Sequence, residues 1–121
     1  LIVHGFDGLD EITITNSTYI AELKDNTISE YEISPKDFGL SLGTLSEISA
    51  QSPEDSLQLI REAFSGDKSA VQDMIALNSG AALYLAKKVK SISDGIEFSF
   101  ELMNNGMAAD KLASYVRVSN S

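Results

Sequence analysis

The residues best suited to chemistry lie in the first eleven positions, where the apolar run Leu1–Val3 leads into a polar segment, residues 4–11. That segment contains three carboxylates and two glycines: Asp7, Asp10, Glu11, Gly5 and Gly8. Mg²⁺ in proteins is held by one or two carboxylates, with substrate phosphates and water completing its shell. Glycines let the backbone turn sharply. The segment therefore predicts either an incomplete Mg²⁺ site or a polar turn whose carboxylates accept hydrogen bonds from backbone N–H groups.

The adjacent carboxylates of Asp10 and Glu11 restrict how such a site could be built. Neighbouring side chains of a regular strand point to opposite faces. Both could therefore bind one ion only if Asp10 still lies in a loop; otherwise each would contact a different ion. His4, the only histidine, is interpreted as a structural hydrogen-bonding residue. The sequence shows no Ser–His or Cys–His pair, no glycine-rich phosphate loop and no calcium-binding EF-hand spacing.

The composition is that of an ordinary globular domain with a strong acidic bias. The 121 residues are 43% hydrophobic and 22% charged, which suits one domain with one core. The net charge of −9 argues against nucleic acid or an anionic membrane as a partner. The absence of cysteine excludes disulfides and thiolate-bound metals. No apolar run approaches the roughly 18 residues of a membrane span, and we expect a cytoplasmic protein.

Strands are expected on both sides of the acidic loop. Leu1–Val3 is typical of the end of a buried strand, which needs neighbouring strands to pair with. Because the chain starts inside this strand and lacks an initial Met, we expect it to be the later part of a longer protein. Residues 11–15 alternate between polar and apolar side chains, which predicts a second strand with Ile12 and Ile14 on one face.

Two further strands are expected at residues 18–23 and 27–33. Asp25 and Asn26 lie between them and tolerate left-handed dihedrals, which favours a tight turn. Residues 11–33 are therefore predicted to form a small antiparallel meander with one face toward solvent.

The remainder of the chain is predicted to be helical. Short helical turns are expected at residues 35–38 and 44–49. Longer helices are expected from Pro53 after the cap Ser52 to Gly66, from Asp67 to about Lys88, from the cap Ser93 to residues 104–106, and over 107–117. The predicted core-facing residues are Leu57, Ile60, Ala63, Phe64, Val71, Met74, Ile75, Leu77 or Asn78, Ala81, Ala82, Leu85, Ile96, Phe98, Phe100, Met103, Leu112, Tyr115 and Val116.

Two residues within the second long helix are unusual. Asn78 is a polar residue in an apolar setting and is interpreted as a core amide with its hydrogen bonds satisfied. Gly80 costs a helix about 1 kcal/mol relative to Ala, and a close approach of another helix would offset this.

The acidic loop also carries a family resemblance. Residues 3–11, Val-His-Gly-Phe-Asp-Gly-Leu-Asp-Glu, closely resemble the HG-x-DG-x-DE segment of the anthranilate phosphoribosyltransferase family. The resemblance continues in order along nearly the whole chain, and the DG-x-DE and P-x-DFGL segments together make it specific. The further segments that resemble this family are its hairpin at Thr18–Ile33, P-x-DFGL at Ser34–Leu40, N-x-A-A-A-L at Asn78–Leu83, and its C-terminal segment at Asp94–Leu112.

The resemblance implies a fold and a reaction. Residues 1–121 would be the C-terminal part of an α/β catalytic domain of the nucleoside phosphorylase and phosphoribosyltransferase type, with a strand and antiparallel hairpin followed by about four helices. The family transfers a phosphoribosyl group from phosphoribosyl pyrophosphate to anthranilate in tryptophan biosynthesis. It uses Mg²⁺ and forms homodimers through an N-terminal helical domain. The implied site residues are Asp10 and Glu11 for metal, His4 and Gly5 for substrate, and Asp7 and Gly8 for the shape of the loop.

The sequence also departs from this family. The family's glycine-rich phosphoribosyl pyrophosphate loop and its N-terminal helical domain do not occur in these 121 residues, so we expect the chain alone not to be a competent enzyme. Asn26 and Ser79–Gly80 replace residues that are often Gly and Ala in the family. Two alternatives stay open: a related phosphoribosyltransferase or nucleoside phosphorylase with another acceptor, and a non-catalytic binding homologue.

Overall fold

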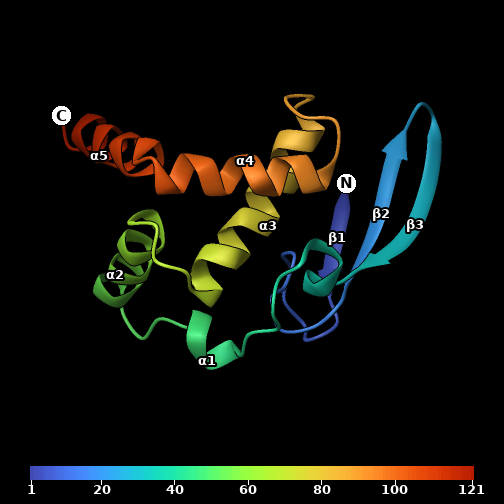
Figure 1. The fold of residues 1–121 in the computed structure, drawn as a ribbon, viewed down its shortest axis with the longest axis horizontal. Helices are drawn as coiled ribbons and strands as arrows, with labels where there is room; N and C mark the ends of the chain where they lie inside the picture. The colour runs from blue at the N-terminus through green and yellow to red at the C-terminus, as the bar shows by residue number, and fades with distance from the viewer.

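A computed structural model describes residues 1–121, which form a small antiparallel sheet followed by helices (Figure 1). The sheet has the order β1-β2-β3. The strands are β1 (Ile2–Gly5), β2 (Thr18–Lys24) and β3 (Thr27–Ile33); the helices are the 3-10 helix η1 (Pro35–Phe38) and α1 (Leu45–Ile48), α2 (Pro53–Phe64), α3 (Ala70–Leu85), α4 (Ile92–Asn104) and α5 (Met107–Ser119). Figure 1 shows the sheet at one end of the molecule, α2 and α5 at the other, and α4 crossing α3 between them. This order of elements confirms the predicted fold class.

The hairpin formed by β2 and β3 is as predicted from its sequence. The strands pair antiparallel in a register that places Lys24 opposite Thr27. The two residues between them, Asp25 and Asn26, have φ values of 49° and 60°. Left-handed dihedrals at both central positions make a two-residue turn whose twist matches that of the flanking strands.

Of the two strands predicted at the start of the chain, one is found. β1 contains most of the expected run and extends to Gly5, but it pairs only with β2 and Ile2 is 73% exposed, so the predicted burial of this strand is not seen. Residues 11–15 form no strand. Ile12 and Ile14 are buried as expected, but Thr13 between them is buried as well. The alternating pattern misled because the N–H groups of Ile12, Thr13 and Thr15 donate to side chains and not to a neighbouring strand.

Three helices, α2, α3 and α4, begin after serine caps. The Ser52 hydroxyl accepts from the Asp55 N–H as predicted. α3 begins after Ser69 and not at Asp67, and it ends at Leu85. α4 is capped by Ser91 and not by Ser93. Each observed cap accepts a hydrogen bond from the third residue of its helix, which satisfies an N–H that the helix itself leaves free.

The core lies between the sheet, residues 12–14 and the crossing of α3 with α4. Its buried apolar residues are Ile12, Ile14, Ile20, Ile33, Ala76, Leu77, Ala81, Ile96 and Met103. The predicted core face of α3 was partly wrong, since Gln72 and Asp73 are buried whereas Ala82 and Leu85 are exposed. Phe98 of α4, also predicted in the core, is exposed. α5 contains no buried residue, and Tyr115 and Val116 are exposed, contrary to prediction.

The crossing of α3 and α4 is a contact between two backbones. A methyl group added at Gly95 would collide with the Gly80 carbonyl oxygen, and one added at Gly80 would lie 2.7 Å from Ile96. Any side chain at either glycine would therefore separate the helices. The predicted close approach at Gly80 is confirmed.

A polar cluster connects the β2–β3 hairpin to the C-terminal end of α3. The Glu22 carboxylate accepts hydrogen bonds from the Tyr84 hydroxyl at 2.6 Å and from the Tyr31 hydroxyl at 2.8 Å. These bonds, led by that of Tyr84, hold the pKa of Glu22 below its usual value despite partial burial. Lys24 donates to the Tyr84 hydroxyl at 3.0 Å.

Every helix of the structure is too short or too polar to span a membrane.

Candidate functional site

The loop after β1 folds around the carboxylate of Asp7. Its Oδ2 accepts hydrogen bonds from the Thr13 hydroxyl at 2.5 Å and from the Thr15 hydroxyl, and its Oδ1 accepts from the Leu9 N–H at 3.1 Å. Burial raises the pKa of Asp7, but the hydrogen bonds from the two threonines and from Leu9 outweigh it, and the pKa lies below the usual 3.8. Asp7 is thus committed to the loop and faces inward.

Backbone hydrogen bonds close the first part of the same loop. The Gly5 N–H donates to the Leu9 carbonyl at 2.8 Å, and the Gly8 N–H donates to the Gly5 carbonyl at 2.9 Å. Gly8 has a φ of 95°, which favours glycine. A methyl group at Gly5 would lie 2.6 Å from Asp7 Oδ1. The turn therefore requires glycine at both positions, for different reasons.

The last part of the loop is held by a residue of α3. Asn78 Oδ1 accepts from the Ile12 N–H at 2.9 Å, and Asn78 Nδ2 donates to the Ile12 carbonyl at 2.8 Å. Nδ2 also donates to the Met74 carbonyl at 3.0 Å. The prediction that the Asn78 amide has its hydrogen bonds satisfied is confirmed, although Asn78 is half-buried beside a cavity and not in the core. Its partner in the loop is Ile12, the residue that follows Glu11.

Asp10 and Glu11 lie between these two fixed parts of the loop. Both are exposed, and their carboxylates make no hydrogen bond or ion pair in the structure. Because residues 11–15 are not a strand, the rule that adjacent side chains point to opposite faces does not apply to this pair. No group of three or more His, Cys, Asp or Glu side chains is placed to hold a metal ion.

The remaining predicted site residues lie at the end of β1. His4 is exposed and pairs through its backbone with Tyr19 of β2. Gly5 is buried and ends the strand. The structure thus brings the predicted residues together on one short strand-to-loop segment, which carries His4, Gly5, Asp7, Gly8, Asp10 and Glu11.

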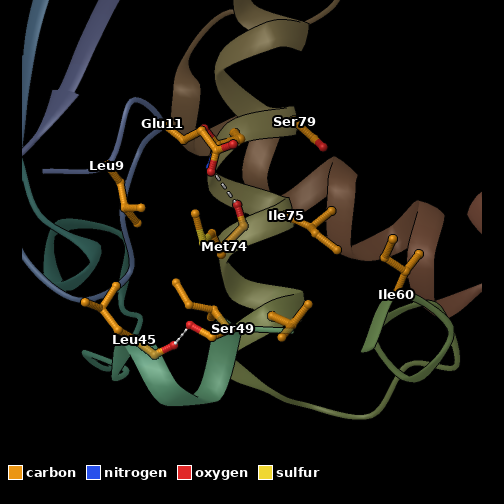
Figure 2. A pocket seen from close by; sticks show the side chains of 11 residues that line it. Leu9, Glu11, Leu45, Ser49, Ile60, Met74, Ile75 and Ser79 are labelled. Carbon is orange, nitrogen blue, oxygen red and sulfur yellow. Dashed lines mark hydrogen bonds between the residues drawn. The ribbon is translucent and has the colours of Figure 1, made fainter. Parts of the chain in front are cut away.

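An open cavity of about 580 Å³ adjoins Glu11. It is mostly apolar and lies between the loop, α1, α2 and α3; Figure 2 shows Glu11 and Ser79 at one rim and Leu45 and Ser49 at the opposite one. Leu9, Met74 and Ile75 line the interior. Glu11 therefore stands at the boundary between solvent and an apolar hollow.

The donor set fits Mg²⁺ as an incomplete site. Two exposed carboxylates with no partner in the protein match the one or two that Mg²⁺ takes when substrate phosphates complete its shell. Two carboxylates alone do not make the closed oxygen cage that a tightly bound resident ion needs. The arrangement thus leaves two carboxylates free to contact a cation whose shell other groups complete.

Sequence reasoning missed three residues of this site. Thr13 and Thr15 were expected on the open face of a strand, and instead both donate to Asp7. Asn78 was recognised as unusual but not as a partner of the loop. Only the polarity of Asn78 within an apolar helix gave any signal, because the contact joins residues 66 positions apart.

Comparison with known proteins gives a consistent set of relatives. Residues 1–109 match the glycosyl transferase family, a/b domain. The chain is 43% identical over 119 residues to an anthranilate phosphoribosyltransferase from Vesicomyosocius okutanii subsp. Calyptogena okutanii, covering 98% of this chain and 35% of the relative.

Two solved structures of anthranilate phosphoribosyltransferases are also similar. The enzyme from Thermus thermophilus has a TM-score of 0.86 at 28% identity. The enzyme from Saccharomyces cerevisiae in complex with PRPP (phosphoribosyl pyrophosphate) and Mg has a TM-score of 0.82 at 25% identity. Each match covers 98% of this chain and 35% of the other. The chain thus spans about a third of the length of the proteins that it matches.

Proposed function

The chain belongs to the glycosyl transferase family, as part of its a/b domain, and from this premise we propose that it holds the metal in phosphoribosyl transfer to anthranilate. The phosphoribosyl group would come from phosphoribosyl pyrophosphate, with release of pyrophosphate, in tryptophan biosynthesis. The relative from V. okutanii carries the name of this activity, and the similar S. cerevisiae structure contains PRPP and Mg.

The proposal rests on the exposure of the adjacent Asp10 and Glu11 carboxylates and on their lack of a partner in the protein. The parts of the loop on either side are hydrogen-bonded, whereas these two carboxylates are exposed and have no partner. Exposed neighbouring carboxylates repel each other, and a bound cation relieves that repulsion. The fold thus keeps two ligands free for a group that comes with the substrate.

Each residue of the segment has a role in this proposal. Asp10 and Glu11 would hold Mg²⁺, which when bound neutralises the negative charge that develops on the departing pyrophosphate. Asp7 and Gly8 shape the loop. His4 and Gly5, at the end of β1, would contact the substrate. Residues 1–121 would form the C-terminal part of a catalytic domain in a cytoplasmic homodimer. The phosphate loop and the dimer interface would come from the two thirds of the relatives' length that this chain does not cover.

An exchange experiment tests the function. The 121 residues replace the matching segment of the V. okutanii relative, and formation of phosphoribosyl anthranilate is measured against Mg²⁺ concentration. We expect turnover, and we expect Asp10→Ala or Glu11→Ala to lower it by about 100-fold or more. Glu32→Ala, at an exposed carboxylate on β3, is the matched control and should change little.

The outcomes separate the alternatives. A folded exchange enzyme that uses another aromatic amine or base and ignores anthranilate would support a related transferase. A folded exchange enzyme without any transfer would support a binding homologue. Full turnover in the Asp10→Ala, Glu11→Ala double variant would reject the metal role.

A further inference from the structure

We propose that Asn78 is a positioning residue for Asp10 and Glu11: its amide fixes the Ile12 backbone and thereby the direction in which the two carboxylates leave the loop. This inference rests on the proposed function, because it assumes that Asp10 and Glu11 receive the metal. It goes further by assigning a role in that site to a helix residue 66 positions away from Ile12.

The Asn78 amide makes a two-way contact with one backbone residue. Asn78 accepts from the N–H and donates to the carbonyl of one residue, Ile12, at 2.9 and 2.8 Å. A paired strand makes this kind of two-way contact in a sheet. The amide cannot be turned over without placing its N–H₂ against the Ile12 N–H, so its orientation is set by its partners. One side chain thus replaces a missing strand neighbour.

The two carboxylates lie between two anchored residues of the loop. On one side Leu9 is held by Asp7 and by the Gly5 N–H. On the other side Ile12 is held by Asn78, and Ile12 is 2% exposed. Only Asp10 and Glu11 lie between the anchors. With both ends fixed, a two-residue span has few conformations, so its carboxylates are held ready for a ligand.

Near Asn78, α3 is in direct main-chain contact with α4. Gly80, two residues after Asn78, packs against the backbone of Gly95. A Cβ atom on either glycine would meet the main chain of the other helix, so the two helices are closely packed here. Because Asn78 is on this closely packed part of α3, its hydrogen bonds to Ile12 fix the loop relative to the two helices.

A matched residue separates positioning from mere stability. Gln72 lies on the same helix, is 3% exposed, and its Nε2 donates to the Ala63 carbonyl at 3.0 Å and to Asn104 Oδ1 at 3.2 Å. It is a buried amide that also bonds to backbone, but its partners lie outside the loop. Gln72→Leu and Asn78→Leu each remove a side-chain amide of α3. The first releases the backbone at Ala63, and the second releases the backbone at Ile12.

The test uses Mn²⁺, which takes oxygen ligands as Mg²⁺ does and broadens nearby NMR signals. In the 121-residue chain, we expect added Mn²⁺ to broaden the amide signals of residues 9–12 first. Asn78→Leu should raise the Mn²⁺ concentration for half-broadening by about 10- to 100-fold, the usual range for partners of metal ligands, and should speed hydrogen exchange at the Ile12 amide. Gln72→Leu should change the half-broadening concentration by less than about twofold.

Each outcome decides the inference. Equal effects of Asn78→Leu and Gln72→Leu, or no effect of Asn78→Leu on the Mn²⁺ response, would overturn the positioning role and leave the proposed function standing. Loop signals that stay sharp in the unchanged chain, with inorganic pyrophosphate added to complete the metal shell, would overturn the metal role and the inference with it. Asn78→Ser, which cannot reach both Ile12 groups, gives the same test should the leucine variant not fold. In the exchange enzyme, Asn78→Leu should raise the Mg²⁺ concentration for half-maximal rate and leave kcat at saturating Mg²⁺ within about threefold.

Discussion

Two segments of this chain that carry acidic residues, the loop of residues 6–15 and the hairpin turn at Asp25–Asn26, are built in different ways. The turn is held by its own backbone dihedrals, with φ of 49° and 60°, and by the strands on either side. The loop has backbone hydrogen bonds of its own, but it also depends on side chains: Asp7 accepts from two threonine hydroxyls, and Asn78 reaches it from α3. The carboxylate of Asp7 is used internally, while those of Asp10 and Glu11 remain free.

The comparison shows that a loop that presents ligands needs anchors from other parts of the fold, whereas a hairpin turn does not. A turn has only to reverse the chain, and local dihedrals suffice. A loop that presents two like charges side by side needs anchors that oppose their repulsion, and these come from elsewhere in the fold. The two segments can therefore be separated by mutations that remove either the anchors or the dihedrals.

The largest expected loss follows from Asp7→Asn. The amide lacks the charge that strengthens both threonine hydrogen bonds, and it sets an N–H₂ group against at least one of the three donors. We expect the free energy of unfolding to fall by about 3 kcal/mol, measured by urea denaturation of the isolated chain. Asp25→Asn in the turn should change it by less than about 0.5 kcal/mol. Similar losses at the two positions would erase the distinction between the segments.

Acid should weaken the loop anchor selectively. The pKa of Asp7 is lowered in the folded chain from its usual 3.8, so its ionised form favours folding. That contribution is complete about one pH unit above this usual value and is lost as pH falls through the folded pKa. The stability difference between the unchanged chain and Asp7→Asn should therefore shrink as pH falls below about 4. A difference that stays constant down to about pH 2 would contradict this assignment.

A smaller loss is expected from Thr15→Val, which removes one of the hydroxyl donors to Asp7 and keeps the side-chain shape. The free energy of unfolding should fall by about 1 to 1.5 kcal/mol. Thr27→Val, at an exposed threonine that begins β3, is the control and should stay within about 0.5 kcal/mol. Equal effects would mean that the Thr15 hydroxyl adds nothing to the anchor.

The smallest effect is expected in the turn. Asn26→Ala removes the side chain that tolerates the left-handed region and should lower the free energy of unfolding by about 1 kcal/mol. Asn26→Gly should be neutral or slightly stabilising. Neither should alter the Mn²⁺ response of residues 9–12, and a change there would show that the two segments are coupled.

The sequence predicted the elements whose causes are local. The hairpin, its turn and the Ser52 cap each depend on residues within a few positions, and all three are found. Residues 11–15 were assigned to a strand because alternating polarity resembles a pleat. In fact Thr13 is buried with its neighbours, since its hydroxyl has Asp7 as a partner.

The candidate site was predictable in its ligands but not in its support. Adjacent carboxylates beside glycines are visible in the sequence itself. The Asn78–Ile12 contact depends on how α3 lies against the loop, which no local pattern encodes. The buried face of α3 was misjudged for the same reason: Gln72 and Asp73 are buried, whereas Val71 and Ile75 line the open cavity.

The glycine crossing of α3 and α4 has a consequence for how this chain can vary. Gly80 and Gly95 occupy each other's side-chain space, so neither can be replaced singly without moving a main chain. A wider helix spacing there would tilt Asn78 and shift the Ile12 backbone that it holds. Substitutions at Gly80 or Gly95 would therefore also displace the Asp10 and Glu11 carboxylates, although neither glycine contacts them.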